Sequence, residues 1–183
     1  IQSAIDSCPK GGTVYLPAEH IFCTGALFLK SDMNLQVDGI LKGSSDPKDY
    51  PWVISRWEGF RRLPEAKEEW ANSTQAQPYN TYVRASLLNV GVYDEGVPGS
   101  YGPFNIENVV IRGSGQINGD GFRLGYNEGC NQHNAGGGKP VPFSPIMNQT
   151  LRGSILRMHN AKNVYVADLT LAYGPGWQVH PIY

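Results

Sequence analysis

The amino-acid sequence predicts a mostly β chain whose short strands stack as the coils of a solenoid. From residue 13 onward, β-rich runs of three to five residues are separated by Gly, Asn, Asp or Pro, the pattern of short strands joined by turns. A template also recurs at residues 34–39, 108–113 and 163–168, where an Asn leads an alternating apolar run that ends in a turn. Recurrence of one strand-and-turn unit is typical of stacked coils.

A short helix is expected before the first strand. Ile1, Ala4, Ile5 and Cys8 recur at helical spacing, and residues 9–12 (PKGG) end that pattern with breaker residues. The β-rich runs then predict strands at residues 13–16, 26–29, 34–37, 109–112, 115–117, 154–158, 164–166, 169–171 and 178–180.

The unequal spacing of the template predicts two long insertions, at residues 56–89 and 119–145, within a single domain that spans residues 1–183. Within the first, residues 64–69 (PEAKEE) place Pro and acidic residues as a helix start does and predict a short surface helix. The second insertion is rich in Gly, Asn and Pro and is expected to be a long loop beside the coils.

Charge and hydropathy exclude two classes of partner. The chain has 15 Lys and Arg against 16 Asp and Glu, so it offers no basic face for nucleic acid. Its longest apolar runs, such as residues 26–29, reach four residues, far short of a membrane span, so no membrane partner is expected. We expect a monomer.

Three cysteines are too few for a disulfide framework. Cys8 and Cys23 either pair or remain buried free thiols, and Cys130 is the third. Asn72 and Asn148 begin N-x-[ST] sequons and are candidate glycosylation sites, which weakly indicates secretion. The chain opens on residues 1–5 (IQSAI) without the features of a signal peptide, so its N-terminus is expected to lie further upstream.

No metal site and no cofactor are expected. The four histidines and three cysteines lack the spacing of metal ligands. Residues 136–140 (GGGKP) lack the spacing and the Ser or Thr of a phosphate-binding loop.

An ordered series of segments carries a family resemblance that covers nearly the whole chain outside the two insertions. The segments are residues 11–17 (GGTVYLP), 24–31 (TGALFLKS), 34–35 (NL), 46–51 (DPKDYP), 56–59 (RWEG), 113–119 (GSGQING), 163–164 (NV) and 176–181 (GWQVHP). In this order they resemble the pectin-degrading glycoside hydrolases of family 28, the polygalacturonases. Asn118 stands where the family usually has Asp, and Asp168 where it usually has Gly.

The resemblance implies a right-handed parallel β-helix and a secreted or extracellular hydrolase, periplasmic if the source is bacterial, that acts on pectic polysaccharide. It also implies an inverting mechanism with paired aspartates. The family's catalytic motifs follow the strand matched by residues 176–181, so we assign no catalytic residue to this chain. The 183 residues are expected to form the N-terminal portion of a longer enzyme and, taken alone, to be inactive and to aggregate or stay partly unfolded.

Arg157, His180 and Trp177 are the candidate substrate-binding residues. Arg157 and His180 are one coil apart, and strand alternation predicts that Leu156, Met158, Val179 and Pro181 face inward while Arg157 and His180 face out as stacked neighbours. Arg binds carboxylates in bidentate fashion, which suits a uronate. The alternatives are an exposed Arg and a structural His packed by Trp177. Trp177 either stacks on a sugar ring or plugs the coil, and its position after a Gly-Pro-Gly corner favours packing.

The near acidic pairs Asp46/Asp49, Glu68/Glu69 and Asp94/Glu95 are expected to be solvated surface residues, because all lie in turn-like or charged stretches. Two functions compete with the hydrolase: a β-helical polysaccharide lyase and a non-catalytic carbohydrate-binding β-solenoid. Since one fold hosts all three, fold alone cannot choose among them.

Overall fold

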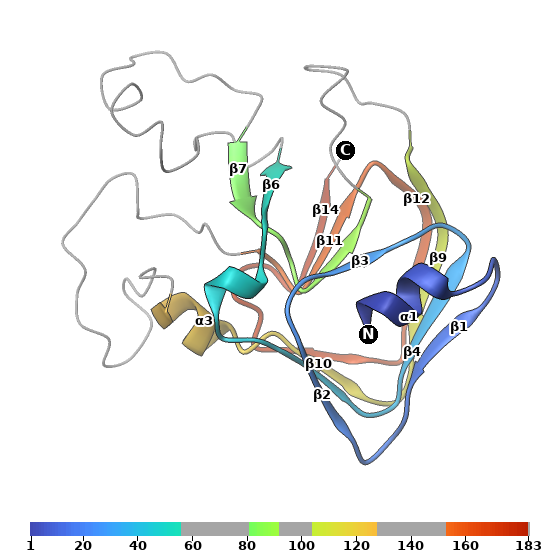
Figure 1. Ribbon diagram of the computed structural model, residues 1–183, viewed down its shortest axis with the longest axis horizontal. Helices are drawn as coiled ribbons and strands as arrows, with labels where there is room; N and C mark the ends of the chain where they lie inside the picture. Colours follow the sequence, from blue (N-terminus) through green and yellow to red (C-terminus); the bar gives the residue numbers. More distant parts are fainter. Residues whose placement is uncertain (56–80, 92–103, 128–152, 183) are drawn as a thin grey trace.

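The computed structural model describes residues 1–55, 81–91, 104–127 and 153–182. Viewed nearly along the coil axis, three parallel sheets form the sides of a triangle (Figure 1). Sheet A contains β1 (Thr13–Leu16), β4 (Met33–Val37), β9 (Ile106–Arg112) and β12 (Ala161–Ala167). Sheet B contains β2 (Ile21–Thr24), β5 (Ile40–Gly43), β10 (Gln116–Asn118) and β13 (Thr170–Ala172). Sheet C contains β3 (Leu27–Leu29), β8 (Leu88–Val90), β11 (Leu156–His159) and β14 (Val179–Ile182).

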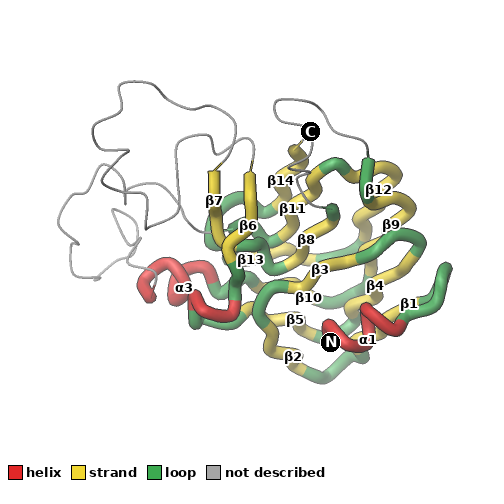
Figure 2. Tube along the Cα trace, turned by 45° about the horizontal axis from the view of Figure 1, so that its top comes forward, coloured by secondary structure: helices red, strands yellow, loops and turns green. Residues whose placement is uncertain are grey.

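Along the sequence the strands visit sheets A, B and C in the same order, coil after coil (Figure 2). All pairings within the three sheets are parallel, so each strand lies directly above its counterpart in the preceding coil. The right-handed parallel β-helix predicted above is confirmed. The predicted strand at residues 13–16 matches β1, and the other eight predicted runs each overlap a strand of the coils.

Strand alternation builds the core. Val14, Leu35, Ile111 and Val166 are register partners across sheet A and point inward, and Leu35 and Ile111 are 0% exposed. Sheets B and C repeat this arrangement with Leu41 and Leu88. Full burial of each such side chain stabilises the fold by about 1.5–3 kcal/mol, and in a coil the same positions align from one turn to the next.

The predicted first helix is present as α1 (Gln2–Ser7), which covers the end of the first coil. Ile5 is 0% exposed and joins the core. The side-chain amide of Gln2 makes two hydrogen bonds with the backbone of Phe28 in β3. Its Nε2 donates to the Phe28 carbonyl oxygen at 3.0 Å, and its Oε1 accepts from the Phe28 N–H at 2.9 Å. The helix therefore satisfies backbone groups that the first strand of sheet C would leave open at its edge.

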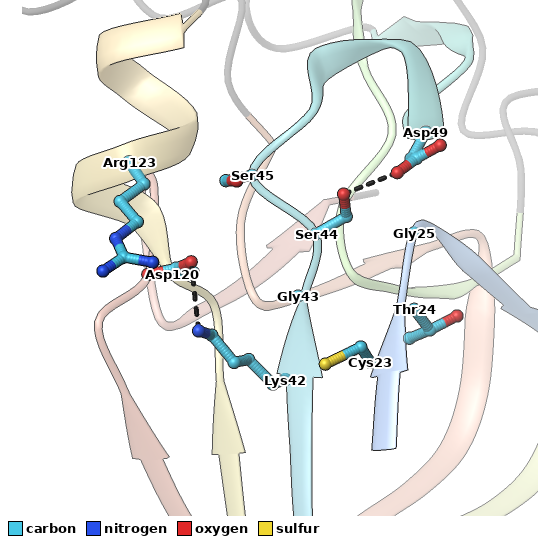
Figure 3. Close-up of a pocket in the computed structure, with 10 residues that line it drawn as sticks. All are labelled: Cys23, Thr24, Gly25, Lys42, Gly43, Ser44, Ser45, Asp49, Asp120 and Arg123. Carbon is cyan, nitrogen blue, oxygen red and sulfur yellow. Dashed lines mark hydrogen bonds and ion pairs between the residues drawn. The ribbon is translucent and has the colours of Figure 1, made fainter. Parts of the chain in front are cut away.

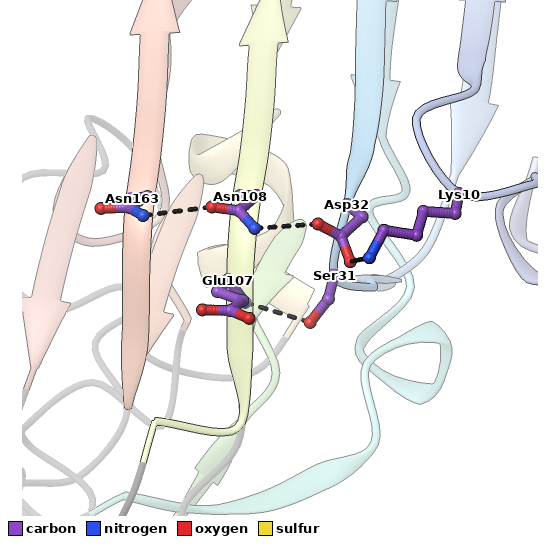
Figure 4. A network of polar contacts seen from close by, with 6 residues as sticks. All are labelled: Lys10, Ser31, Asp32, Glu107, Asn108 and Asn163. Carbon is purple, nitrogen blue, oxygen red and sulfur yellow. Dashed lines mark hydrogen bonds and ion pairs between the residues drawn. The ribbon is translucent and has the colours of Figure 1, made fainter.

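Near the start of the sheet A strands, a polar ladder runs across the coils (Figure 4). Asn163 Nδ2 donates to Asn108 Oδ1 at 3.1 Å, and Asn108 Nδ2 donates to Asp32 Oδ1 at 2.8 Å. Lys10 Nζ closes the ladder 3.2 Å from Asp32 Oδ2. Asp32, Asn108 and Asn163 all have a positive φ, near 57°, which Asn and Asp tolerate better than other non-glycine residues.

The ladder corrects one detail of the sequence template. The template equates Asn34 with Asn108, whereas in the structure Asn34 pairs with Val110 and Asp32 takes the ladder position. The shift is two residues, so it leaves every inward side chain inward.

The insertions are also revised. The first begins after η1 (Pro47–Asp49) with an antiparallel hairpin of β6 (Trp52–Ser55) and β7 (Thr81–Arg84), and the chain is back in the coils by β8. The predicted boundary at residue 89 is therefore wrong, because Leu88 and Asn89 belong to sheet C. The second contains α3 (Gly121–Asn127), where only loop was predicted. Within the coils, strands β2, β5 and β8 were not predicted either.

Several predicted features lie outside the described residues: the helix at 64–69, the sequons at Asn72 and Asn148, and Cys130. Cys8 and Cys23 are both free; Cys8 is buried and Cys23 is exposed, so the bridge between them does not form. Across the described ranges, no helix has the length and apolar character needed to cross a bilayer.

Candidate functional site

Sheet C is the side of the triangle that the chain's insertions flank. Every connection from sheet A to sheet B is short, from Leu16 to Ile21 in the first coil and from Ala167 to Thr170 in the last. The long excursions leave after β5 and β10 and return at β8 and β11, which are sheet C strands. In solenoids such insertions gather on one face, often the binding face. The outer surface of sheet C is therefore the candidate binding face.

Four residues form one row across the strands of sheet C. Phe28 pairs with Asn89, Asn89 with Arg157, and Arg157 with His180. We call these residues the sheet C row. Leu156 and Met158 pack into the core, so strand alternation turns Arg157 to the outside. The prediction that Arg157 and His180 are stacked neighbours in adjacent coils is confirmed.

Their burial differs from the expectation of an exposed Arg. Arg157 is only 3% exposed and His180 9%, although both lie on the outer side of the sheet. His159, two residues after Arg157 on the same strand, is 2% exposed and was not singled out from the sequence. Ionisable side chains are seldom this buried unless other polar groups surround them. The outer side of sheet C therefore holds a concentrated set of polar groups screened from water.

The two basic residues of the sheet C row, Arg157 and His180, differ in charge. Burial lowers the pKa of His180 from its ordinary value of 6.5 to about 4, and the positive charge of Arg157 adds to this shift. His180 is consequently neutral at any pH above about 5. A neutral imidazole offers one donor and one acceptor, while the Arg157 guanidinium supplies the positive charge of the row.

Trp177 lies at the exposed end of this group. Its side chain is 68% exposed, and its ring centroid lies 6.1 Å from that of His180 with the planes tilted by 45°. In the described part of the chain the indole is therefore accessible from outside, which favours sugar stacking over packing. The backbone holds it in place, because the Trp177 carbonyl oxygen accepts from the N–H of Ile155 at 3.0 Å. An exposed indole on a fixed backbone can stack on a sugar ring.

Asn89 supports the row rather than offering a free polar group. Its Oδ1 accepts from the Ser86 N–H at 2.9 Å, and its Nδ2 donates to the carbonyl oxygens of Ser86 at 2.7 Å and Leu27 at 3.0 Å. These bonds tie the approach to β8 onto the preceding coil. Asn89 thus fixes the strand that lies beside Arg157.

The one near acidic pair within the described residues, Asp46 and Asp49, has structural partners. Asp46 caps η1, since its Oδ1 accepts from the Lys48 N–H at 2.9 Å, and Asp49 accepts from Ser44 Oγ at 2.5 Å. Both therefore serve turn structure, whereas Glu68/Glu69 and Asp94/Glu95 lie outside the described residues. In the part of the chain that the structure describes, no three His, Cys, Asp or Glu side chains gather as a metal site would require.

Comparison with known proteins identifies relatives of this chain in sequence and in structure. The chain is 35% identical, over 125 residues and 67% of its length, to an exo-poly-α-D-galacturonosidase of Dickeya chrysanthemi. Its structure resembles that of a family 28 exopolygalacturonase of Yersinia enterocolitica, with a TM-score of 0.59, 28% identity and 96% of this chain covered. It also resembles a hyperthermoactive exopolygalacturonase of Thermotoga maritima, with a TM-score of 0.63, 24% identity and 98% covered.

The chain spans only part of each of these proteins: 17% of the Dickeya protein, 31% of the Yersinia chain and 38% of the Thermotoga chain. No model of a known protein family matches it.

Proposed function

The chain is related in sequence and in fold to the exopolygalacturonases of glycoside hydrolase family 28, and on that premise we propose that the protein hydrolyses α-linked galacturonan or a related pectic polysaccharide. We place it outside the cytoplasm, where such a polymer is found, as a secreted or periplasmic monomer.

The reaction in this proposal is an inverting hydrolysis. One carboxylic acid protonates the leaving oxygen while a second carboxylate activates water on the other side of the sugar, the two lying roughly 6.5–9.5 Å apart. The 183 residues contain neither the Asp-Asp pair nor the Gly-His-Gly motif of the family. We therefore propose that the catalytic carboxylates lie outside this chain, and that these coils bind and orient the polymer.

One observation carries the binding role: the sheet C row places a buried guanidinium beside a neutral imidazole, on the face that the insertions flank. Arg157 is proposed to bind a uronate carboxylate through charge-assisted hydrogen bonds, which are strong where water is excluded. His180 is proposed to hydrogen-bond a sugar hydroxyl or ring oxygen. Trp177 is proposed to stack on the apolar face of a pyranose ring.

The test of the activity uses the full-length protein and polygalacturonic acid. Reducing ends and the absorbance of unsaturated uronates are followed in one tube. We expect new reducing ends without that absorbance. Unsaturated product would instead indicate a β-helical lyase, and binding without turnover would indicate a carbohydrate-binding solenoid; either result would overturn the hydrolase proposal.

The binding role is tested by Arg157→Gln and Trp177→Ala in the full-length enzyme. We expect KM for polygalacturonate to rise about tenfold or more in Arg157→Gln, with a smaller change in kcat, because the lost interaction is one of binding. Trp177→Ala should likewise raise KM, because it removes the ring proposed to stack on the sugar. Arg112→Gln, an exposed arginine of sheet A, is the matched control and should leave KM unchanged. Unaltered KM in both site variants would refute the role.

A further inference from the structure

A pocket of about 480 Å³ lies away from the sheet C row, at the corner where sheet B strands end (Figure 3). Three consecutive coils build it: the ends of β2 and β5 and the start of α3, which follows β10. We call it the corner pocket. Its volume falls within the range of about 300–1,000 Å³ that is usual for small-molecule sites.

Two glycines allow the corner loops to close around this space. A side chain at Gly25 would collide with the backbone of Asp49, and one at Gly43 would lie 2.8 Å from the Tyr50 hydroxyl oxygen. Backbone bonds then fix the walls. The Ala26 N–H donates to the Asp49 carbonyl oxygen at 3.0 Å, and the Ser44 N–H donates to the Thr24 carbonyl oxygen at 2.7 Å. The pocket is thus defined by the main chain of adjacent coils rather than by side chains alone.

The polar groups of the pocket fall on two walls. On the α3 side, Lys42 Nζ lies 3.5 Å from Asp120 Oδ2, and Arg123 lies beside this ion pair. On the η1 side, Ser44 Oγ donates to Asp49 Oδ2. Within the described ranges no carboxylate pairs with Arg123, so its guanidinium is available to a ligand in the pocket.

This arrangement selects among ligand chemistries. A free guanidinium favours a carboxylate, which it binds with two parallel N–H···O bonds. Asp49, Asp120 and Ser44 favour a ligand rich in hydroxyl donors. The two cations Lys42 and Arg123 are matched by the two carboxylates Asp49 and Asp120, so the pocket suits a monoanion better than a phosphate dianion. The best match is a monoanion that carries both a carboxylate and several hydroxyls.

We infer that the corner pocket is an accessory binding site for a single uronic acid residue, with Arg123 on the uronate carboxylate and Asp49 accepting from ring hydroxyls. None of the sheet C row residues lines the corner pocket. The choice of a uronate rests on the proposed function; the anion-and-hydroxyl chemistry of the pocket does not.

Cys23 makes the site directly measurable, because this exposed thiol lines the pocket whereas Cys8 is buried. In the full-length protein, the rate at which an uncharged maleimide modifies Cys23 is followed by mass spectrometry of the peptide that contains it, against galacturonate concentration. We expect galacturonate to slow modification saturably. The neutral sugar galactose should need a concentration about tenfold higher or more, since it lacks the charge-assisted bonds.

Substitutions of Arg123 test whether galacturonate protects Cys23 by binding in the corner pocket. Arg123→Gln should raise the galacturonate concentration for half-protection about tenfold or more, and Arg123→Lys should restore part of the loss by keeping the charge. Arg112→Gln, which lies on sheet A outside the pocket, should behave as the parent protein. Absence of protection, or equal protection in Arg123→Gln, would overturn the inference.

The two proposals can fail separately. Protection of Cys23 in a protein that releases no reducing ends would support the pocket and refute the hydrolase. Hydrolysis of polygalacturonate without protection of Cys23 would refute the pocket and leave the hydrolase standing.

Discussion

His180 couples the sheet C row to pH. In the folded protein its pKa is lowered to about 4, whereas an unfolded chain has the ordinary value of 6.5. As pH falls below 6.5 the unfolded state takes up a proton that the folded state does not take up until about pH 4. The stabilising effect of the neutral, buried imidazole is therefore fully present above pH 6.5 and is lost as pH falls towards 4.

This predicts a difference between the parent protein and His180→Gln, which cannot titrate. Between pH 7 and pH 5 the parent should lose about 1 kcal/mol more free energy of unfolding than the variant, after allowance for solvent screening of a group near the surface. Urea unfolding at the two pH values measures this. Asp32 and Asp38, whose pKa values are lowered by hydrogen bonds, are present in both proteins, so their contributions cancel in the comparison. Equal pH dependence in the two proteins would show that His180 is not protected from protonation.

Residue-level prediction from sequence succeeded for the pairing of Arg157 with His180. It failed for their burial, and Val179, which was expected to face inward, is 41% exposed. Alternation along residues 154–158 and 178–180 correctly placed Arg157 beside His180, because strand geometry is local and has a period of two. Burial at 3% and 9% could not be read in the same way, since it depends on segments distant in sequence. For Trp177, the adjacent Gly-Pro-Gly corner suggested packing, but the turn leaves the indole 68% exposed.

At the scale of elements, the corner between sheets A and B depends on close backbone stacking. Gly113 has φ 143°, a conformation that L side chains rarely adopt, and a Cβ there would collide with the Val37 carbonyl in the coil below. In every coil the chain must also turn within a few residues here, because the sheet B strand begins only a few residues after the sheet A strand ends. Gly113 is therefore a position where a single methyl group must displace a neighbouring coil.

Gly113→Ala is expected to lower the free energy of unfolding by about 3 kcal/mol or more, because backbone strain and a clash combine. Gly11→Ala is the matched control: Gly11 also has a positive φ, of 75°, but open space surrounds its Cβ position. Its cost should be about 1 kcal/mol, from the left-handed conformation alone. Urea denaturation of both variants measures the difference, and similar losses would contradict the role given to stacking.

Strands were predictable where alternation and turn residues coincide, as at residues 13–16 and 34–37. The missed strands lack that signal. In β8, Leu88, Asn89 and Val90 are all buried, so no alternation marks the strand, and Asn89 reads as a turn residue although its amide is used inside the structure. In β2, the apolar residues Ile21 and Cys23 are exposed, so the alternation of apolar residues would assign the outer face of the strand to the core. Tertiary context decides such cases.

At the scale of the whole molecule, the first insertion begins and ends at one place. Ser55 of β6 pairs with Thr81 of β7, and the Pro51 carbonyl oxygen accepts from the Ala85 N–H at 2.8 Å. The chain thus returns to the point from which it left before it forms β8. The sequence predicted that an insertion exists here from the spacing of the template, but not where it ends, because re-entry depends on this hairpin rather than on a local motif.

Replacement of residues 56–80 by Asn-Gly should therefore leave the coils folded, since a two-residue turn can join paired strand ends. In the full-length protein we expect the β-sheet signal of the far-UV circular dichroism spectrum to be retained and the free energy of unfolding to stay within about 1 kcal/mol of the parent. Leu88→Ala, just beyond the hairpin and 0% exposed, should instead cost about 2–5 kcal/mol. Loss of the coil structure on replacement would mean that the insertion is part of the folding unit.

The contrast between the two kinds of corner has an evolutionary consequence. Short connections from sheet A to sheet B lock the coils together along one edge, while the connections that lead into sheet C differ greatly in length from coil to coil. A lineage of such proteins can lengthen, shorten or exchange the segments around sheet C without altering how the coils assemble. New specificities can then be acquired through insertions and deletions rather than through changes in the core, and libraries for engineering are best varied at the same corners.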